Sequence, residues 1–506
     1  MGSRPGRPVW AHSQGHNEGL WKMFVDFCSG RDVKEVPACD SALARADLAT
    51  NEASCLALIK AGVLDSREAS RLAAALLELG ETIRTGHFHL DPNLEDIHIN
   101  IESFLTKTAG NLAGKIHSGR SRNDQVACDI RLWQRAMILN HLTRLCDLGD
   151  ILLKCSLRER KTLMPGFSHH QRAFVTTFGH LMASHCQALL RDIERGVEVL
   201  HRVDCCPLGA AAGFGTSWPI DRDYLMKLLG FRDVVTNSLD AVSSRLEVEC
   251  ETAAWLALWM THASCLAQDL ILFSMEEFRW IRLAPETTTG SSIMPQKRNP
   301  DFAEVIKGKA SLVHGALASL LSLGKGQPSG YHRDSQYSKP LGQDIWREVS
   351  AIPTLFKAVL QTMTLDRIRM KQAVQGGFLE AAEWADTIAQ ESGLPFREVY
   401  GAISLAVDDC RELGCLTLEA VNKALRSRKL AFEVSDKTAG QLSSPDLLLA
   451  RRCSSGSPNP EEVAASVERY RGELASLRGH LKTSQQRWLK SDQHRLAALR
   501  RFAEKG

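Results

Sequence analysis

The sequence predicts an all-α protein built around a central bundle of long helices. Only 6% of the 506 residues are aromatic, whereas leucine and alanine are abundant, and this balance favours helix over strand. Three long runs, at 124–161, 176–203 and 243–279, space their apolar residues as a helix does. Because no strand-like segments alternate with these runs, they are typical of a helix bundle and not of a parallel sheet.

The length of the chain predicts two or three domains, because single cores stop growing well below 506 residues. We expect an N-terminal helical domain at 1–119, whose first 19 residues form a mobile tail. A central domain of five long helices is expected at 120–372. A small helical domain at 373–506 is expected to complete the chain.

The bulk composition is that of a soluble globular protein, with 44% hydrophobic and 24% charged residues. The 62 Lys and Arg residues nearly balance the 59 Asp and Glu residues, which leaves a net charge of +3. A charge this small gives no reason to expect a nucleic acid or a membrane surface as a partner.

The 14 cysteines are scattered and contain no C-x-x-C pair. Residues 1–19 are rich in Gly, Pro, Arg and His and lack the apolar core of a secretory signal. Together these features predict reduced thiols in a cytoplasmic protein. A disulfide or metal framework, and an organelle transit peptide at the N-terminus, are the alternatives.

The N-terminal part of the chain predicts three helices before the first long one. Two helices are expected at 40–62 and 65–85, and a third opens at Glu95 after a break at 87–94. A polar loop at 117–125 leads into the first long helix.

Beyond the first long helix, helices alternate with breaks. In order, we expect a polar break at 164–171, a helix at 176–203, a Gly/Ala-rich loop at 206–219, helices at 243–279 and 301–323, an irregular loop at 324–340, a helix at 345–362, shorter helices interrupted at 393–395 and 454–460, and a charged terminal helix. The apolar run at 312–323 is too short to span a bilayer and is expected in the bundle core.

One stretch, residues 287–301, indicates chemistry most clearly. Gly290 stands between a threonine run and two serines; such a run can move and can bring backbone N–H groups close to a ligand. Lys297 and the positive N-terminus of the following helix would lie beside these serines. This combination suits an anion or a developing negative charge.

The start of the helix after this stretch has two candidates. Asn299 followed by Pro300 is typical of an N-cap with proline at the first helical position. Asp301 and Glu304 have the spacing of a capping box, which would start the helix two residues later.

Three further polar segments flank the predicted long helices, at 117–125, 166–173 and 327–339. Each alone is consistent with a solvated turn, and a lone Ser-His-His is more often a turn or a satisfied core histidine than a catalytic site. Because all of them lie at the ends of bundle helices, we interpret them as parts of one site.

The ordered run Gly-Ser-Ser-x-Met-Pro-x-Lys-x-Asn-Pro at 290–300 resembles the signature of the fumarase/aspartase superfamily, whose members eliminate fumarate from a substituted succinate. His-Ser-Gly-Arg-Ser-Arg-Asn-Asp-Gln at 117–125 and Pro-Gly-Phe-Ser-His-His-Gln-Arg-Ala at 165–173 resemble the argininosuccinate lyase family, to which the delta crystallins of lens also belong. Glu95-Asp-Ile-His98 and the spacing of Asp40, Leu43 and Asp47 are similar too. The resemblance covers about residues 40–470.

The resemblance implies a fumarase/aspartase-like fold and a reversible elimination of argininosuccinate to arginine and fumarate, with no metal or organic cofactor. It implies that Ser291 is the base that takes the Cβ proton, and that Lys297 and Asn299 hold the carboxylate that absorbs the carbanion charge. His169, oriented by Glu304, would serve proton transfer to the leaving nitrogen; the identity of the general acid stays open. The other positions that match substrate-binding residues are Asn123, Ser168, Tyr331, Gln336 and Lys339. The family packs four chains into a homotetramer, with each active site built from three chains.

The sequence also departs from the family pattern. Thr50-Asn51 stands where the family has Gly-Ser, Leu246 replaces the final aspartate of a Ser-Glu-Arg-Asp run, and Tyr337-Ser338 replaces Glu-Asp. Ser29 is only a candidate for the family's N-terminal substrate serine. These departures leave two alternatives, a catalytically weak crystallin-like member and a lyase acting on another N-substituted aspartate such as adenylosuccinate.

Overall fold

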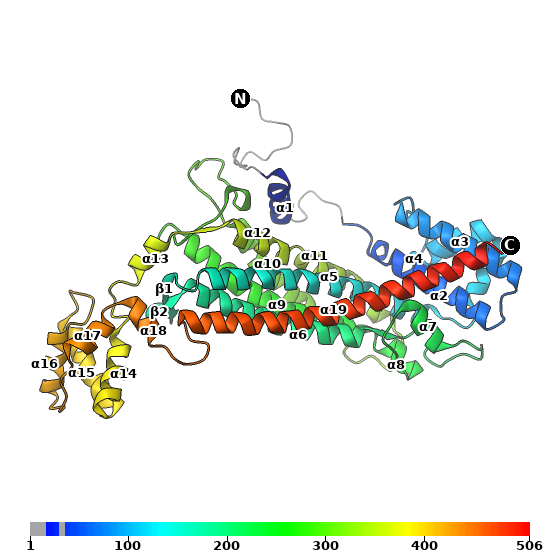
Figure 1. The fold of residues 1–506 in the computed structure, drawn as a ribbon. Helices are drawn as coiled ribbons and strands as arrows, with labels where there is room; N and C mark the ends of the chain where they lie inside the picture. Colours follow the sequence, from blue (N-terminus) through cyan, green and yellow to red (C-terminus); the bar gives the residue numbers. More distant parts are fainter. Residues whose placement is uncertain (1–16, 30–35, 506) are drawn as a thin grey trace.

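The protein is all-α, as predicted, and its helices lie in three groups along one axis, which makes it elongated (Figure 1). The structure is a computed structural model that describes residues 17–29 and 36–505. Most of the expected tail at 1–19 lies outside these residues. Its last two residues belong to a helix, because α1 spans Glu18–Ser29.

The first group follows the prediction closely. It contains η1 (Cys39–Leu43), α2 (Ala44–Lys60), α3 (Ser66–Arg84), α4 (Ile97–Ala109) and η2 (Gly110–His117). Asp65 caps α3 in a capping box with Glu68, and the Asp96 carboxylate caps α4 by accepting from the backbone N–H of Ile99. The apolar faces of these helices share one buried core.

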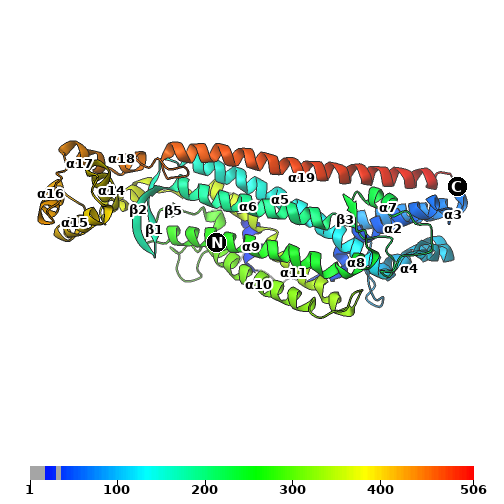
Figure 2. The same cartoon turned by 90° about the horizontal axis from the view of Figure 1, so that it is seen from below.

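The bundle contains α5 (Arg122–Arg158), α6 (Phe178–Val203), α9 (Arg245–Ser274), α10 (Asp301–Leu323), α11 (Ser338–Val349) and α12 (Ile352–Thr362). Helix α5 packs on α6, and α9 packs on α10 (Figure 2). The single helix expected at 345–362 is two helices. Pro353 lacks a backbone N–H and is tolerated only in the first turn of a helix, so α12 starts anew at Ile352.

Helix α9 is long and apolar enough by composition to cross a membrane, with a mean hydropathy of 1.3 over its most apolar window. In the structure it lies inside the bundle, where α6, α10 and α11 contact it. Its buried side chains, among them Trp255 and Trp259, belong to the main core. Its apolar composition is therefore explained by packing.

The break between helices expected at 164–171 is present, and it is a β-hairpin, which the sequence did not predict. Strands β1 (Leu163–Ser168) and β2 (Gln171–Thr177) pair antiparallel, with a bulge between Gly166 and Phe167. Short two-residue pairs also form between β3 (Cys205–Cys206) and β4 (Asp233–Val234) and between β5 (Ile281–Arg282) and β6 (Thr364–Leu365). These strands are too short to show a period in the sequence. The short helices α7 (Arg222–Leu229), α8 (Ser238–Ser243) and α13 (Arg367–Ala373) complete the connections.

Both predicted caps of α10 are wrong, although the helix spans Asp301–Leu323 as expected. The residue before it, Pro300, makes no side-chain cap. Asn299 instead pairs its backbone with Thr289, N to O 2.8 Å and O to N 3.1 Å. The Asp301 carboxylate accepts from the Thr289 hydroxyl. The polar side chains thus close the base of the loop before α10 and do not cap the helix.

The terminal helix α19 (Pro460–Ala503) leaves the third group, which contains α14 (Ala381–Ser392), α15 (Phe396–Asp409), α16 (Leu418–Ser427), α17 (Asp436–Leu442) and α18 (Pro445–Ala450). It runs back along α5 and α6 to α3 (Figure 1). Leu474 and Trp488 join the bundle core and Leu499 joins the first group's core. The domain division stays a prediction, but residues 460–503 pack with the first two groups.

Candidate functional site

The predicted site residues lie at opposite ends of the bundle. Asn123 lies in the first turn of α5 beside the first group of helices, whereas the β1–β2 hairpin follows the far end of α5 (Figure 1). Helix α5 has 37 residues, which is about 55 Å at 1.5 Å per residue. Helix α10 starts at the hairpin end, since it returns antiparallel to α9. The Ser291 loop therefore lies far from Asn123, Tyr331 and Lys339 within one chain.

The loop at 290–298 is closed at its base by the Thr289–Asn299 pair and exposes most of its side chains. Inside it, the Ser291 hydroxyl oxygen accepts from the backbone N–H of Met294 at 3.2 Å and of Ile293 at 3.4 Å. Two N–H donors aimed at one oxygen favour negative charge on that oxygen. Lys297, three residues on from Met294, is exposed in the same loop.

The tip of the β1–β2 hairpin carries Ser168, His169 and His170, all exposed. His169 and His170 have φ angles of +51° and +60°. A two-residue turn with positive φ at both positions matches the twist of a hairpin, but it is costly for residues other than Gly, Asn or Asp. The structure thus holds two histidines at a strained tip. Among the described residues, no hydrogen bond joins His169 to Glu304, which is exposed in the first turn of α10.

Asn123 lies in the first turn of α5, and its neighbours fix this turn firmly. The Asp124 carboxylate accepts from the backbone N–H of Gly209 and of Ala211, at 2.9 and 2.8 Å. Burial raises the pKa of Asp124 to about 6. Arg120 donates to the Asn51 side-chain oxygen at 2.9 Å. Asn51, one of the departures from the family pattern, thereby helps to hold the loop at 117–125.

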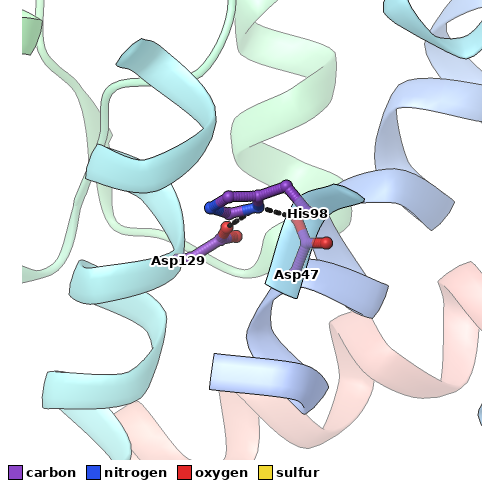
Figure 3. A group of neighbouring side chains, drawn as sticks. All are labelled: Asp47, His98 and Asp129. Atoms are coloured by element: carbon purple, nitrogen blue, oxygen red, sulfur yellow. Dashed lines mark hydrogen bonds and ion pairs between the residues drawn. The ribbon is translucent and has the colours of Figure 1, made fainter. Parts of the chain in front are cut away.

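A buried cluster of Asp47, His98 and Asp129 lies behind this loop (Figure 3). His98 Nδ1 is 3.0 Å from Asp47 Oδ1 and 3.5 Å from Asp129 Oδ2. Gln125 donates to Asp47, and the Thr50 hydroxyl donates to Asp129 at 2.6 Å. Burial raises the pKa of both carboxyl groups, while the charge of Arg120 opposes that shift.

By residue type this cluster could hold a cation, but its contacts indicate a structural role, the joining of three helices. The three side chains come from α2, α4 and α5, so the cluster joins these helices directly behind Asn123. The positive charge of Arg120 already offsets one carboxylate. The spacing of Asp47 and the motif around His98 are visible in the sequence, but neither indicates that the two side chains meet.

The second predicted group occupies 331–339, part of the segment expected to be an irregular loop. That expectation is wrong for its second half, because η4 spans Arg333–Tyr337 and α11 begins at Ser338. Gln336 is exposed, whereas the Lys339 side chain is 8% exposed and its ammonium lies 2.5 Å from Asp40 Oδ1. The segment is helical, and of its two predicted substrate-binding residues Lys339 is buried against another part of the chain whereas Gln336 is not.

Tyr331 lies over Arg245, which was not among the predicted site residues. The Arg245 guanidinium is 5.4 Å from the centre of the Tyr331 ring, within the range of a cation–π contact. Leu246 and Ser338, two departures from the family pattern, lie in the two segments that meet here.

Comparison with known proteins gives concordant matches. Residues 37–315 match the family model described as Lyase. Proteins named argininosuccinate lyase are similar to nearly the whole chain. That of Desulforamulus reducens is 36% identical over 87% of this chain and 94% of its own length, and that of Nitrosococcus oceani is 39% identical over 87% and 93%. That of Chromobacterium violaceum is 38% identical over 86% and 94%.

Two solved structures show the same architecture. EDDS lyase in complex with formate is 25% identical, with a TM-score of 0.84 and 97% of each chain covered. Class II fumarase from Schistosoma mansoni is 13% identical, with a TM-score of 0.67 over 89% of this chain and 97% of that one, a likeness of fold alone.

Proposed function

The chain belongs to the argininosuccinate lyase family, and we propose that Ser291, His169 and Lys297 carry its chemistry in sites shared between chains. The protein is a carbon–nitrogen lyase that eliminates argininosuccinate to L-arginine and fumarate. The observation that carries this function is the similarity to relatives of that name over nearly their full length.

Ser291 is the proposed base for the Cβ proton. An alcohol is a weak base in water, so its surroundings must favour the alkoxide. The backbone N–H groups of Met294 and Ile293 already point at its oxygen, and Lys297 adds positive potential. Lys297 would also hold the carboxylate that takes up the charge as the Cβ–H bond breaks, with Asn299 beside it.

His169 is the proposed proton donor or relay to the leaving guanidinium nitrogen. Its exposed position at a strained hairpin tip supports this role, since strained backbone concentrates at functional sites. Glu304, exposed in the first turn of α10, would orient His169 from a neighbouring chain. Asn123, Ser168, Tyr331, Gln336 and Lys339 would bind the remaining carboxylates and the arginine half.

The protein is proposed to be a cytoplasmic homotetramer whose partners are its small-molecule substrate and its own copies. Support comes from the separation of the site residues, since one chain holds Asn123 and Ser291 at opposite ends of its bundle. Neighbouring chains packed antiparallel would bring these ends together.

Mixing two impaired variants tests the shared site. We expect Ser291→Ala chains, which are inactive alone, and His169→Asn chains, which are strongly impaired alone, to regain activity after they are unfolded and refolded together. If Ser291 and His169 of one site come from different chains, about a quarter of the sites receive both intact residues. If one chain supplied both, the mixture would gain no activity.

A second candidate, a lyase for another N-substituted aspartate, is favoured only by Tyr337 and Ser338, which change the charge around the proposed arginine-binding segment. Comparing turnover of argininosuccinate with that of adenylosuccinate decides between the two.

A further inference from the structure

The segment that begins at Gly330 is held against the end of α8 and the start of α9 by three side-chain contacts. In chain order, the Ser243 hydroxyl accepts from the Gly330 N–H at 2.8 Å, the Arg245 guanidinium lies under the Tyr331 ring, and Glu249 Oε1 accepts from the Ser338 hydroxyl at 2.8 Å. Each contact falls on or beside a residue proposed to bind the arginine half, since Lys339 directly follows Ser338.

Arg245 and Glu249, the two charged side chains among these contacts, are deeply buried. Arg245 and Glu249 are each 3% exposed, and Ser338 is fully buried. Within the described chain, Arg245 Nε and Nη2 and Glu249 Oε2 have no hydrogen-bond partner. Burial raises the pKa of Glu249, and the charge of Arg245 opposes this shift. Buried charges with unmade hydrogen bonds are costly, so packing alone gives no reason for them.

We infer that Arg245 and Glu249 are positioning residues for the arginine half of the substrate. This inference rests on the proposed function. Neither side chain is accessible to a ligand, so both act through others. Arg245 fixes the plane of the Tyr331 ring, and Glu249 fixes Ser338 and with it the first turn of α11.

The consequence is that Lys339 is placed from two sides before substrate arrives. Asp40 holds its ammonium, and Glu249 holds the backbone that carries it. A preformed site loses less conformational freedom on binding, so affinity for the arginine half is higher. Fumarate is proposed to be held by Lys297 and Asn299, beside Ser291, and by no residue of this network, so its affinity should not depend on Arg245 or Glu249.

The test is the calorimetric affinity of the full-length protein for arginine and, separately, for fumarate. We expect Glu249→Ala and Arg245→Met to weaken arginine binding roughly tenfold, the size of one lost charge-assisted hydrogen bond. Fumarate binding should stay within twofold of the parent. Glu247→Ala, an exposed acid on the same helix, should change neither affinity.

Two conservative variants separate positioning from a general loss of structure. Glu249→Gln keeps a partner for the Ser338 hydroxyl and should recover most of the arginine affinity. Ser338→Ala removes this hydrogen bond but keeps both buried charges, Arg245 and Glu249, and should weaken arginine binding while the protein stays folded. Arginine affinities within twofold of the parent in all of these variants, or equal losses for arginine and fumarate, would overturn the inference.

Binding is measured without turnover, so the result does not depend on the parent's activity. Failure of the parent to release fumarate from argininosuccinate would count against the proposed function. Unchanged arginine affinity in the variants would count against the network alone.

Discussion

The ammonium of Lys339 lies 2.5 Å from the carboxylate of Asp40, with the two side chains only 8% and 14% exposed. The cation proposed to bind a substrate carboxylate is therefore already held in place by another carboxylate, 299 residues away in sequence. An exposed lysine would have to give up its mobility to bind the substrate, whereas this one is positioned in advance.

Replacing Lys339 with Ala is expected to lower the specificity constant for argininosuccinate about 10- to 150-fold, because a charge-assisted hydrogen bond is worth roughly 1.5–3 kcal/mol. Asp40→Asn keeps the ammonium and serves as the control, with a smaller loss. A specificity constant for Lys339→Ala within twofold of the parent would show that the pair with Asp40 is structural only.

Replacing Ser291 with Ala should abolish turnover while substrate affinity changes little, because the proton transfer to its oxygen occurs only in the transition state. Turnover is followed as fumarate release and affinity by calorimetry. Ser292→Ala, the exposed neighbour in the same loop, is the matched control. Normal turnover in Ser291→Ala would move the base elsewhere, with His169 the next candidate.

The two histidines at the hairpin tip should differ sharply in their effect. Asn tolerates positive φ, so His169→Asn and His170→Asn both preserve the turn. We expect His169→Asn to lower turnover by about 100- to 10,000-fold, the usual contribution of a general acid or base. His170→Asn should stay within about threefold of the parent, since only its neighbour is assigned to proton transfer. Equal losses in both variants would assign the effect to hairpin structure.

Stability should depend on pH through His141, which is buried among Trp255, Trp259 and Trp346. Burial lowers its pKa from 6.5 to about 3. The unfolded chain binds a proton at His141 below pH 6.5 and the folded protein does not. The stability that His141 contributes is therefore complete above pH 6.5 and falls by about 1.4 kcal/mol for each pH unit below it.

Replacing His141 with Leu removes this titration. We expect the urea midpoint of the variant to fall less than that of the parent between pH 7 and pH 5.5, at one fixed protein concentration. His494→Leu, at an exposed position of α19, is the control. Identical shifts of the midpoint in parent and His141→Leu would contradict the buried, neutral imidazole.

The long helices could be predicted from the sequence because their signal is local. The apolar spacing and the capping box of Asp65 lie within the segments they define, and α10 was placed to the residue. The hairpin could not be predicted from the sequence, because Pro165-Gly166 is typical of a break between elements. Its turn also uses histidines where Asn or Gly is usual. The break between α11 and α12 follows from Pro353, because a proline is tolerated only in the first turn of a helix.

The candidate site was predictable only as a set of motifs. Ser291, His169 and Lys297 are predicted from short ordered runs, each of which is continuous in the chain. The contacts of Lys339 with Asp40, of Arg245 with Tyr331, and of His98 with Asp47 and Asp129 join distant segments. No local pattern encodes such pairs, so the structure was needed to show that these side chains meet.

Fumarate release from argininosuccinate by the purified full-length protein tests the central claim most directly. The account predicts that fumarate and arginine appear in equal amounts, that Ser291→Ala reduces release to background, and that adenylosuccinate gives none. Release by the parent no faster than by Ser291→Ala would contradict the assignment of this chain as an argininosuccinate lyase with Ser291 as its base.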